Sequence, residues 1–103
     1  MRIYLAGKYS DDNIIGCLNN IHNGIKQAVK IIKDGNEVFC PFLDYQFHFF
    51  DKTLTKEDYQ RNSMAFVEIC DELWVLPDSE KSLGTQREIE TAKSLNIPIR
   101  YLK

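Results

Sequence analysis

Short apolar runs alternate along this chain with longer segments whose apolar residues recur at the spacing of an α-helix. The short runs predict buried strands, because each is bounded by glycine, proline or polar turn residues. They are Arg2–Ala6, Glu37–Cys40, Glu72–Leu76 and Pro98–Leu102. The longer segments predict helices over about Gly16–Lys33, Thr55–Ile69 and Thr85–Leu95. This alternation indicates βαβ units with right-handed crossovers and a parallel sheet covered on both faces.

The length of 103 residues is that of one domain. We therefore expect a single domain over residues 1–103, an α/β three-layer sandwich of the Rossmann-like or flavodoxin-like kind with a parallel sheet of four or five strands. In such sheets, ligands bind outside the carboxyl ends of the strands, near the point where the strand order reverses. Three loops should meet in that crevice, namely Gly7–Ser10, Phe42–Phe50 and Pro77–Gly84.

The charge balance argues against several classes of partner. The net charge is -2 and no cluster of Lys and Arg is visible, so we expect no polymeric nucleic acid as a partner. The chain opens with a short apolar strand rather than a charged segment followed by a long apolar one. We expect neither secretion nor a membrane segment, and hence a cytoplasmic protein.

The three cysteines, Cys17, Cys40 and Cys70, are odd in number and widely spaced. This pattern favours neither a disulfide framework nor a zinc site, and we expect no metal ion. Each cysteine has apolar neighbours in the sequence, which predicts buried free thiols in a reducing compartment.

The last predicted helix carries one carboxylate on its apolar side. If the helix begins near Thr85, Ile89 and Ala92 mark its buried face, and Glu88 precedes Ala92 by about one turn. Glu90 lies roughly 160° from Ala92 around the helix and should be solvated. Glu88 is therefore a candidate active group. The alternative is that it is acidic only because the helix dipole favours carboxylates in a first turn.

The segment that leads into this helix has the features of an anion site. Ser82 and Thr85 offer hydroxyl groups, Gly84 has no side chain to block an approaching ligand, and a helix N-terminus presents free backbone N–H groups. The loop Gly7–Ser10 adds a glycine and a lysine without completing a Walker or G-x-G-x-x-G motif. A plain helix N-cap is the alternative for the serine or threonine.

Aromatic residues are crowded into the loop after the second predicted strand. They could stack on a nucleobase or another flat ring, with Tyr45, Phe47 and His48 lining the pocket, or some could simply pack beneath the loop. His48 could equally be a structural hydrogen-bonding group. The set is Phe42, Tyr45, Phe47, His48, Phe49 and Phe50.

Three motifs together resemble the nucleoside 2-deoxyribosyltransferase superfamily, and most of all its branch of 2'-deoxynucleoside 5'-monophosphate N-glycosidases and related small phage and bacterial proteins. The resemblance covers nearly the whole chain. The spacing Ser-x-Gly-x-x-x-Glu, together with an upstream acidic strand, is its most specific part. The motifs are Ile3–Gly7, Cys70–Leu76 and Ser82–Ala92.

The resemblance implies a role for individual residues. Glu88 would be the nucleophile that attacks the anomeric carbon and forms a covalent glycosyl-enzyme, as in a retaining glycosidase. Tyr4 would orient that nucleophile, and Ser82 would bind the 5'-phosphate. The loop after the second strand would hold the base, with Tyr45 and His48 as its expected contacts. The remaining expected contacts of the sugar and phosphate are Gly7, Lys8, Ser10, Gly84 and Thr85.

The sequence departs from the family pattern at the group that protonates the leaving base. Family enzymes usually carry an aspartate on the helix before the third strand, and the matching neighbourhood here is Arg61–Met64, which holds no acid. Asp58 is the nearest upstream carboxylate and could serve only if the helix register is shifted. Family enzymes also have further chain that contributes to a neighbouring subunit's site, whereas this sequence ends at Lys103.

The expected activity is hydrolysis or transfer of the N-glycosidic bond of a 2'-deoxynucleoside 5'-monophosphate. The expected partner is thus a small nucleotide or nucleoside, without a cofactor, and the resemblance implies a homodimer. Two alternatives stay open. One is a nucleotide-binding protein that senses or sequesters its ligand with weak or no chemistry, and the other is a structural or interaction module.

Overall fold

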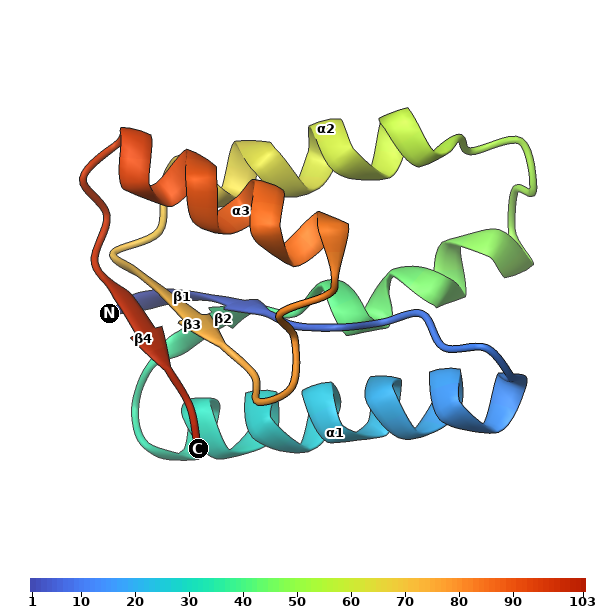
Figure 1. Ribbon diagram of the computed structural model, residues 1–103, viewed down its shortest axis with the longest axis horizontal. Helices are drawn as coiled ribbons and strands as arrows, with labels where there is room; N and C mark the ends of the chain where they lie inside the picture. The colour runs from blue at the N-terminus through green and yellow to red at the C-terminus, as the bar shows by residue number, and fades with distance from the viewer.

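One parallel sheet of four strands forms the centre of the computed structural model, which describes residues 1–103. Its order is β2-β1-β3-β4, with β1 (Arg2–Ala6), β2 (Glu37–Phe39), β3 (Glu72–Val75) and β4 (Ile99–Tyr101). One face is covered by α1 (Ile14–Lys33), and the other by α2 (Lys56–Val67) and α3 (Leu83–Ser94) (Figure 1). The predicted α/β Rossmann-like sandwich is confirmed, with four strands.

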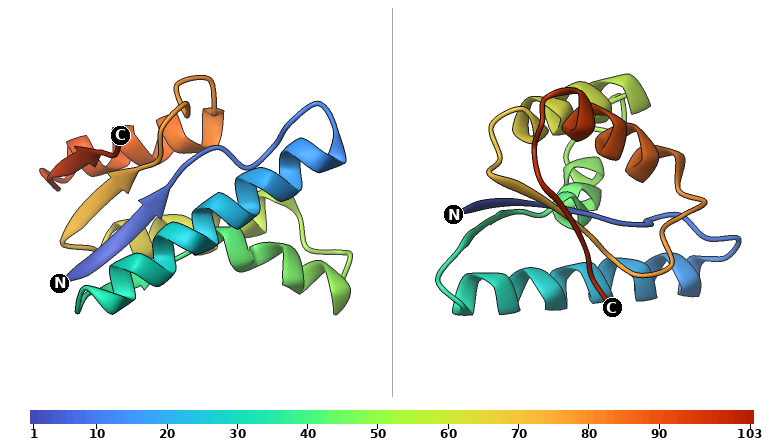
Figure 2. Two further views of the ribbon diagram at one scale, coloured as in Figure 1. Left: turned by 90° about the horizontal axis from the view of Figure 1, so that it is seen from below. Right: turned by 60° about the vertical axis from the view of Figure 1, so that its left-hand side comes forward.

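The alternation of side chains along β1 divides the core into two layers. Ile3 and Leu5 are buried against α1, whereas Tyr4 and Ala6 are buried against α2 and α3. This is the two-residue period of a strand whose faces are both covered. Figure 2 shows the sheet between α1 on one side and the other two helices on the opposite side. Because Tyr4 faces α3, it can reach residues on the inner side of that helix.

The segment after β2 differs from the expected irregular loop. Residues Pro41–Phe49 form a 3-10 helix, η1. Pro41 stands at its start, where the fixed φ of proline favours a helical turn. Phe42 is 1% exposed, and its ring lies against Gly24 of α1, where an added Cβ would come within 2.3 Å of the ring. The sequence showed no helical period here, because this short helix is held by one anchoring aromatic residue rather than by an apolar stripe.

Helix starts follow the sequence signals, with small shifts. The predicted capping box at Thr55 and Asp58 is present, with hydrogen bonds of 2.9 and 3.1 Å. Helix α1 starts at Ile14, earlier than predicted, because Asn13 caps it by accepting a 2.8 Å bond from the N–H of Gly16. The ends of α2 and of the strands also lie within two residues of the predicted positions.

The start of α3 matters more than the other shifts. Ser82 is the N-cap, its Oγ accepting a 3.3 Å bond from the N–H of Thr85, so the helix begins at Leu83 and not at Thr85. The predicted start placed Glu88 in the first turn, but the observed start places it in the second, and no acidic residue lies in the first turn. The influence of a helix dipole falls off within the first turn. The dipole therefore does not explain an acid at this position.

The prediction for the cysteines was right in part. All three thiols are free, but each is only partly buried, which corrects the expectation of fully buried thiols. Cys17 exchanges contacts with the backbone of Asp11, and the Cys70 thiol donates to the carbonyl oxygen of Val67 at 3.2 Å. None of the helices has the length and apolar character needed to cross a bilayer.

The strand order reverses between β1 and β3. The chain crosses from β1 to β2 on one side and then returns to β3 on the other side of β1. Loops that leave the carboxyl ends of these two strands diverge to opposite faces of the sheet and leave a crevice between them. A 2.8 Å bond from the N–H of Leu76 to the carbonyl oxygen of Ala6 holds the two strand ends together at this point.

Candidate active site

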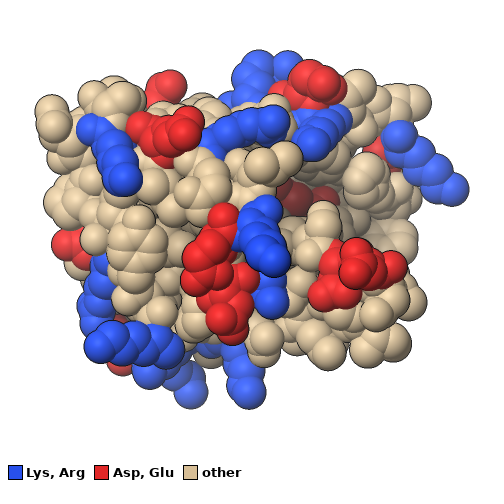
Figure 3. Space-filling view, in the orientation of Figure 1, with Lys and Arg blue, Asp and Glu red and all other residues tan.

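A cavity of about 830 Å³ opens at the carboxyl ends of β1 and β3. Its lining comes from the loop after β1, from η1, from the first turns of α2, and from the loop and helix α3 that follow β3. Figure 3 shows acidic atoms recessed in a hollow and basic side chains around it. The volume lies within the range that holds a small organic ligand.

Most of the residues that the sequence predicts to meet at the carboxyl ends of the strands line this cavity. All the expected substrate contacts line the cavity, and so does Glu88. Tyr4 is the exception, because it is fully buried beneath the cavity floor rather than in its lining. The residues that do line it are Gly7, Lys8, Ser10, Tyr45, His48, Ser82, Gly84, Thr85 and Glu88.

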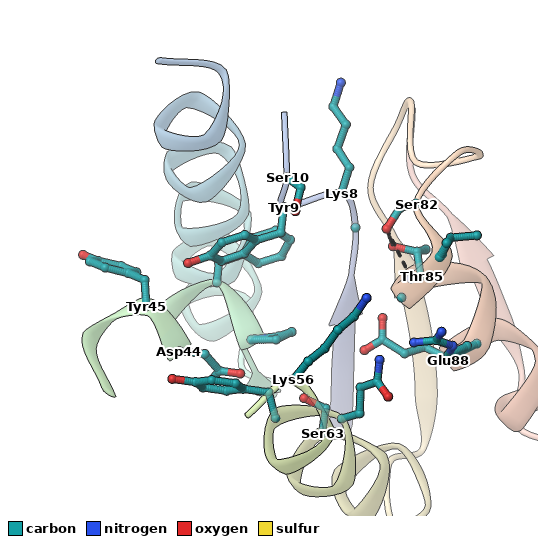
Figure 4. A pocket seen from close by; sticks show the side chains of 18 of the residues that line it. Lys8, Tyr9, Ser10, Asp44, Tyr45, Lys56, Ser63, Ser82, Thr85 and Glu88 are labelled. Carbon is teal, nitrogen blue, oxygen red and sulfur yellow. Dashed lines mark hydrogen bonds between the residues drawn. The ribbon is translucent and has the colours of Figure 1, made fainter. Parts of the chain in front are cut away.

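Glu88 is the central acidic group of this cavity. It is 9% exposed, projects from α3, and accepts a hydrogen bond from the hydroxyl of Tyr4 through Oε2. Figure 4 shows its carboxylate directed into the open space of the cavity. Tyr4 in turn stacks on Phe39, with ring centroids 5.2 Å apart, so its hydroxyl is held in place by packing from β2. One face of the carboxylate is thus fixed by protein and the other is open.

Burial controls the protonation of this pair. Desolvation raises the pKa of Glu88 to about 7, the hydrogen bond from Tyr4 acts in the opposite direction, and the charge of Asp44 adds to the rise. Burial and the neighbouring carboxylate also raise the pKa of Tyr4 far above its usual value, so Tyr4 remains a hydrogen-bond donor. A carboxyl group with a pKa near neutrality in a cavity is a frequent mark of a functional site.

The start of α3 presents hydroxyl and backbone groups to the same cavity. Ser82 Oγ accepts from the backbone N–H and the hydroxyl of Thr85, at 3.3 and 2.9 Å, so Ser82 is the N-cap of α3. No protein acceptor takes the hydroxyl proton of Ser82. Gly84 has nothing within 4 Å of an added Cβ. The absence of its side chain leaves room in the cavity and is not required by packing.

The loop after β1 is held by neighbouring elements. The backbone N–H of Lys8 donates to the hydroxyl of Ser79 at 3.0 Å, and Asn20 of α1 donates to the carbonyl oxygens of Tyr9 and Ser10 at 3.2 and 3.4 Å. Gly7 differs from Gly84, because its added Cβ would come within 2.7 Å of a neighbouring leucine side chain. The glycine in this loop therefore serves close packing.

Four basic side chains line the cavity although the whole chain is slightly acidic. The two ion pairs in the structure involve other residues, so all four cationic groups are free to meet an anionic ligand. They come from three different segments, which explains why the sequence shows no basic cluster. They are Lys8, Lys56, Lys81 and Arg87.

The side of the cavity formed by η1 was only partly predicted. Tyr45 and His48 line it, but Phe47 does not, being 50% exposed and outside the lining. Phe49 and Phe50 are 79% and 91% exposed and also lie outside. The expectation that Phe47 lines the pocket was therefore wrong. Tyr45 and His48 lie three residues apart, one turn of a 3-10 helix, and so share the cavity side of η1, whereas Phe47 lies off that row.

The position of the expected aspartate on α2 is occupied by other groups. Ser63 lines the cavity and is 9% exposed. Asp58 is outside the cavity, where it completes the capping box and pairs with Arg61 at 3.1 Å. Its hydrogen bonds hold its pKa below the usual value. The helix register is therefore not shifted in a way that would bring Asp58 to the site.

Sequence reasoning missed several cavity residues, among them Asp44, Lys56 and Tyr59. Asp44 stands alone among the aromatic residues of η1, and this isolated carboxyl was the available signal. Lys56 and Tyr59 belong to the first turn of α2, for which the sequence pattern predicts only a helix start. No group of three or more His, Cys, Asp or Glu side chains is arranged to hold a metal ion in residues 1–103.

The acidic motif before β3 proves to be structural. Asp71 accepts a 2.6 Å bond from the N–H of Arg2, and its own N–H donates to the carbonyl oxygen of Arg2 at 2.7 Å. These contacts lie at the amino ends of β1 and β3, away from the cavity. Asp71 therefore fixes the register of the two strands whose opposite ends form the site.

Comparison with solved structures identifies a protein of the same fold. A 2-deoxyribosyltransferase from the psychrotolerant bacterium Bacillus psychrosaccharolyticus, described as a biocatalyst for the synthesis of antiviral and antitumoral nucleosides, matches with a TM-score of 0.69 and 18% sequence identity. The match covers 98% of this chain and 71% of that chain. At this identity the likeness shows a shared fold, in agreement with the motifs found in the sequence.

Comparison by sequence gives a family. No curated protein matches the chain. The family model described as "Domain of unknown function (DUF4406)" matches residues 1–101. Because this match spans nearly every residue that forms the sheet, the helices and the cavity, the chain belongs to the DUF4406 family.

Proposed function

We propose that this protein cleaves or transfers the N-glycosidic bond of a 2'-deoxynucleoside 5'-monophosphate through a covalent glycosyl-enzyme on Glu88. The observation that carries the proposal is the buried Glu88 carboxylate, which is hydrogen-bonded by Tyr4 and faces an open cavity. The fold shared with a 2-deoxyribosyltransferase supports it.

The proposed reaction has two steps. In the first, an Oε atom of Glu88 bonds to C1' of the sugar, the C1'–N bond breaks, and its electron pair leaves with the base. In the second, water or a second base attacks C1', and the bond from C1' to the Glu88 oxygen breaks, with its electron pair returning to the carboxylate. Water gives 2-deoxyribose 5-phosphate, and a second base gives a new nucleotide. Tyr4 positions the carboxylate, and its O–H can stay with the oxygen that does not attack.

The start of α3 is suited to the 5'-phosphate. The Ser82 hydroxyl, the space above Gly84 and the first backbone N–H groups of the helix converge on one part of the cavity. Lys8 and Lys81 lie on the adjoining loops and add positive charge. A phosphate favours such a site over a neutral 5'-hydroxyl, which supports a nucleotide rather than a nucleoside as substrate.

The decisive experiment measures base release. The purified protein is incubated with a panel of deoxynucleoside monophosphates and with the matching nucleosides, and free base is separated by chromatography. We expect release from at least one monophosphate and at least about a thousandfold loss in Glu88→Ala. Glu90→Ala, on the outer side of the same helix, is the matched control and should retain activity. No base release from any nucleotide or nucleoside would overturn the proposal.

A second candidate is a nucleotide-binding protein with weak or no chemistry. The observation that favours it is the absence of a carboxyl group on α2 at the cavity, where Ser63 is found instead. This candidate predicts that Glu88→Gln binds a nucleotide as tightly as the wild type, in calorimetry, while neither protein releases base. Slow but measurable turnover that is lost in Glu88→Gln would decide for the enzyme.

The proposal includes a single domain over residues 1–103, a homodimer and a cytoplasmic setting. Light scattering during size-exclusion chromatography should give twice the 12.0 kDa of one chain, or about 24 kDa. A mass of one chain would contradict the dimer without affecting the proposed chemistry.

A further inference from the structure

The cavity contains a second half-buried carboxyl group, Asp44 of η1, opposite the nucleophile candidate. Asp44 forms no hydrogen bond and no ion pair in the structure, although most buried acids do. Figure 4 shows Asp44 and Glu88 on opposite sides of the open space, which places any ligand in the cavity between them. An acid without a protein partner on a cavity surface is available to a ligand.

Packing holds Asp44 in this position. Phe42, two residues earlier in η1, fills the space above Gly24 of α1, where even an added methyl group would overlap its ring. Tyr9 also stacks on Phe42, with ring centroids 6.4 Å apart. Because Phe42 packs against both Gly24 and Tyr9, η1 is a packed element that holds Asp44 in place.

The other carboxyl groups near the cavity are unsuitable partners for Glu88. Asp58 lies outside the cavity and is committed to Thr55 and Arg61. Asp78 lines the cavity but is exposed, on the loop next to the anion-binding segment. Asp44 is thus the one remaining carboxyl that lines the side opposite the start of α3.

The groups around Asp44 fit a nucleobase. The Tyr59 hydroxyl on α2 is shielded from solvent and has no hydrogen-bond partner in the structure, so a ligand atom can supply one. Burial raises the pKa of Asp44 to about 6, which keeps a fraction of it protonated near neutral pH. The titratable and charged groups that share this part of the cavity are Tyr9, Tyr45, His48, Lys56, Tyr59 and Glu88.

We propose that Asp44 is the general acid that protonates the leaving base when Glu88 attacks C1', an inference that rests on the proposed function. As the C1'–N bond breaks, the Asp44 carboxyl gives its proton to a nitrogen or oxygen of the base and becomes a carboxylate. In the second step that carboxylate takes a proton from the water that attacks C1'. The products are free base and 2-deoxyribose 5-phosphate, and both carboxyl groups return to their starting states.

The first test compares leaving groups that do and do not need a proton. 2'-Deoxyguanosine 5'-monophosphate needs one, whereas 7-methyl-2'-deoxyguanosine 5'-monophosphate carries a positive base that leaves unassisted. In Asp44→Asn, we expect kcat for the first substrate to fall by about 10²- to 10⁴-fold and kcat for the second by less than about tenfold. Asp51→Asn, just beyond η1 and outside the cavity, is the control and should match the wild type on both.

Equal losses on the two substrates would assign Asp44 a structural role and overturn the inference. An unchanged kcat in Asp44→Asn would do the same.

If the wild type does not accept the methylated nucleotide, the pH profile decides. The wild-type profile should fall on the alkaline side as Asp44 loses its proton, and Asp44→Asn should lack that fall. If the wild type releases no base from these two substrates, the same comparison is made with the nucleotide of the panel that it does cleave. Release of base from no nucleotide or nucleoside at any pH refutes the proposed function itself, a result distinct from failure of the Asp44 variant alone.

Discussion

The two sides of the cavity are built differently. One side, made by Tyr4 of β1 and by Ser82 to Glu88 of α3, is buried in the sheet-and-helix core and internally hydrogen-bonded. We call it the nucleophile side after the role proposed for Glu88. The η1 side, formed by η1 and the start of α2, is more exposed and includes the Asp44 carboxyl and the Tyr59 hydroxyl, which have no protein partner. Burial raises the pKa of both Glu88 and Asp44, but only Glu88 accepts a hydrogen bond, from Tyr4, that acts to lower its pKa.

This difference teaches how an active-site pair can be arranged. A group that must attack a fixed carbon benefits from a rigid mount and a fixed hydrogen bond. A group that must protonate different leaving bases benefits from a site in which the bound base supplies the missing hydrogen-bond partners. The nucleophile side is therefore expected to resist ligand-induced change, whereas the η1 side is expected to gain most of its order from the bound base.

The largest effect should come from neutralising Glu88, the buried carboxyl group proposed as the nucleophile. The pKa of Glu88 is raised from 4.5 to about 7, because burial disfavours its carboxylate. The stability associated with the protonated group is therefore fully present below pH 4.5 and is lost as the pH rises through 7. Glu88→Gln should therefore raise the free energy of unfolding at pH 8 by up to about 3 kcal/mol and have little effect at pH 4. Chemical denaturation at both pH values measures this.

Asp44→Asn should show a gain of the same sign but smaller, because the Asp44 carboxyl is only half-buried and water screens it. If Asp44→Asn stabilises the protein as much as Glu88→Gln, the two sides do not differ in rigidity and burial as described.

Two glycines near Glu88 differ in what lies beside them: protein atoms next to Gly7 and open cavity next to Gly84. Gly7→Ala should lower the free energy of unfolding by about 1–3 kcal/mol, because its Cβ overlaps the side chain of Leu76. Gly84→Ala should leave stability within about 0.5 kcal/mol and raise KM for the monophosphate, because the new methyl group enters the cavity. Thermal unfolding and steady-state kinetics test the pair, and a destabilised Gly84→Ala would contradict the assignment.

Removing the hydrogen bond to the nucleophile should have an intermediate effect. Tyr4→Phe leaves Glu88 without the donor that lowers its pKa, so the limb of the pH–rate profile that reports Glu88 should move to higher pH. We expect about a tenfold lower kcat at neutral pH, equivalent to about 1.4 kcal/mol. An unshifted profile would mean that Tyr4 packs against the nucleophile without orienting it.

The smallest effect is expected on the η1 side. Tyr59→Phe removes a shielded hydroxyl that has no partner in the free protein, so stability should not fall. Binding of a nucleotide should weaken by roughly threefold to tenfold if the base supplies the missing partner. Calorimetry on both proteins measures this, and unchanged binding would remove Tyr59 from the base site.

Much of the site could be predicted because its parts lie in regular elements. The helical period placed Glu88 on the inner side of α3, and the order of strands and helices placed that helix at the crevice. The same reasoning placed the start of α3 one half-turn late, because Ser82 and Thr85 are both plausible caps. Only the hydrogen bond between Ser82 and Thr85 settles which residue begins the helix.

The sequence by itself determined the parallel sheet, its covering helices and the inward-facing carboxylate, because these follow from local periodicity and from the handedness of βαβ units. The tertiary structure alone decided which distant groups meet. It brought four cations from separate segments around one cavity, buried Tyr4 under Glu88, and fixed η1 through the contact of Phe42 with Gly24. Such contacts depend on shape complementarity between elements far apart in the chain, and no local pattern records them.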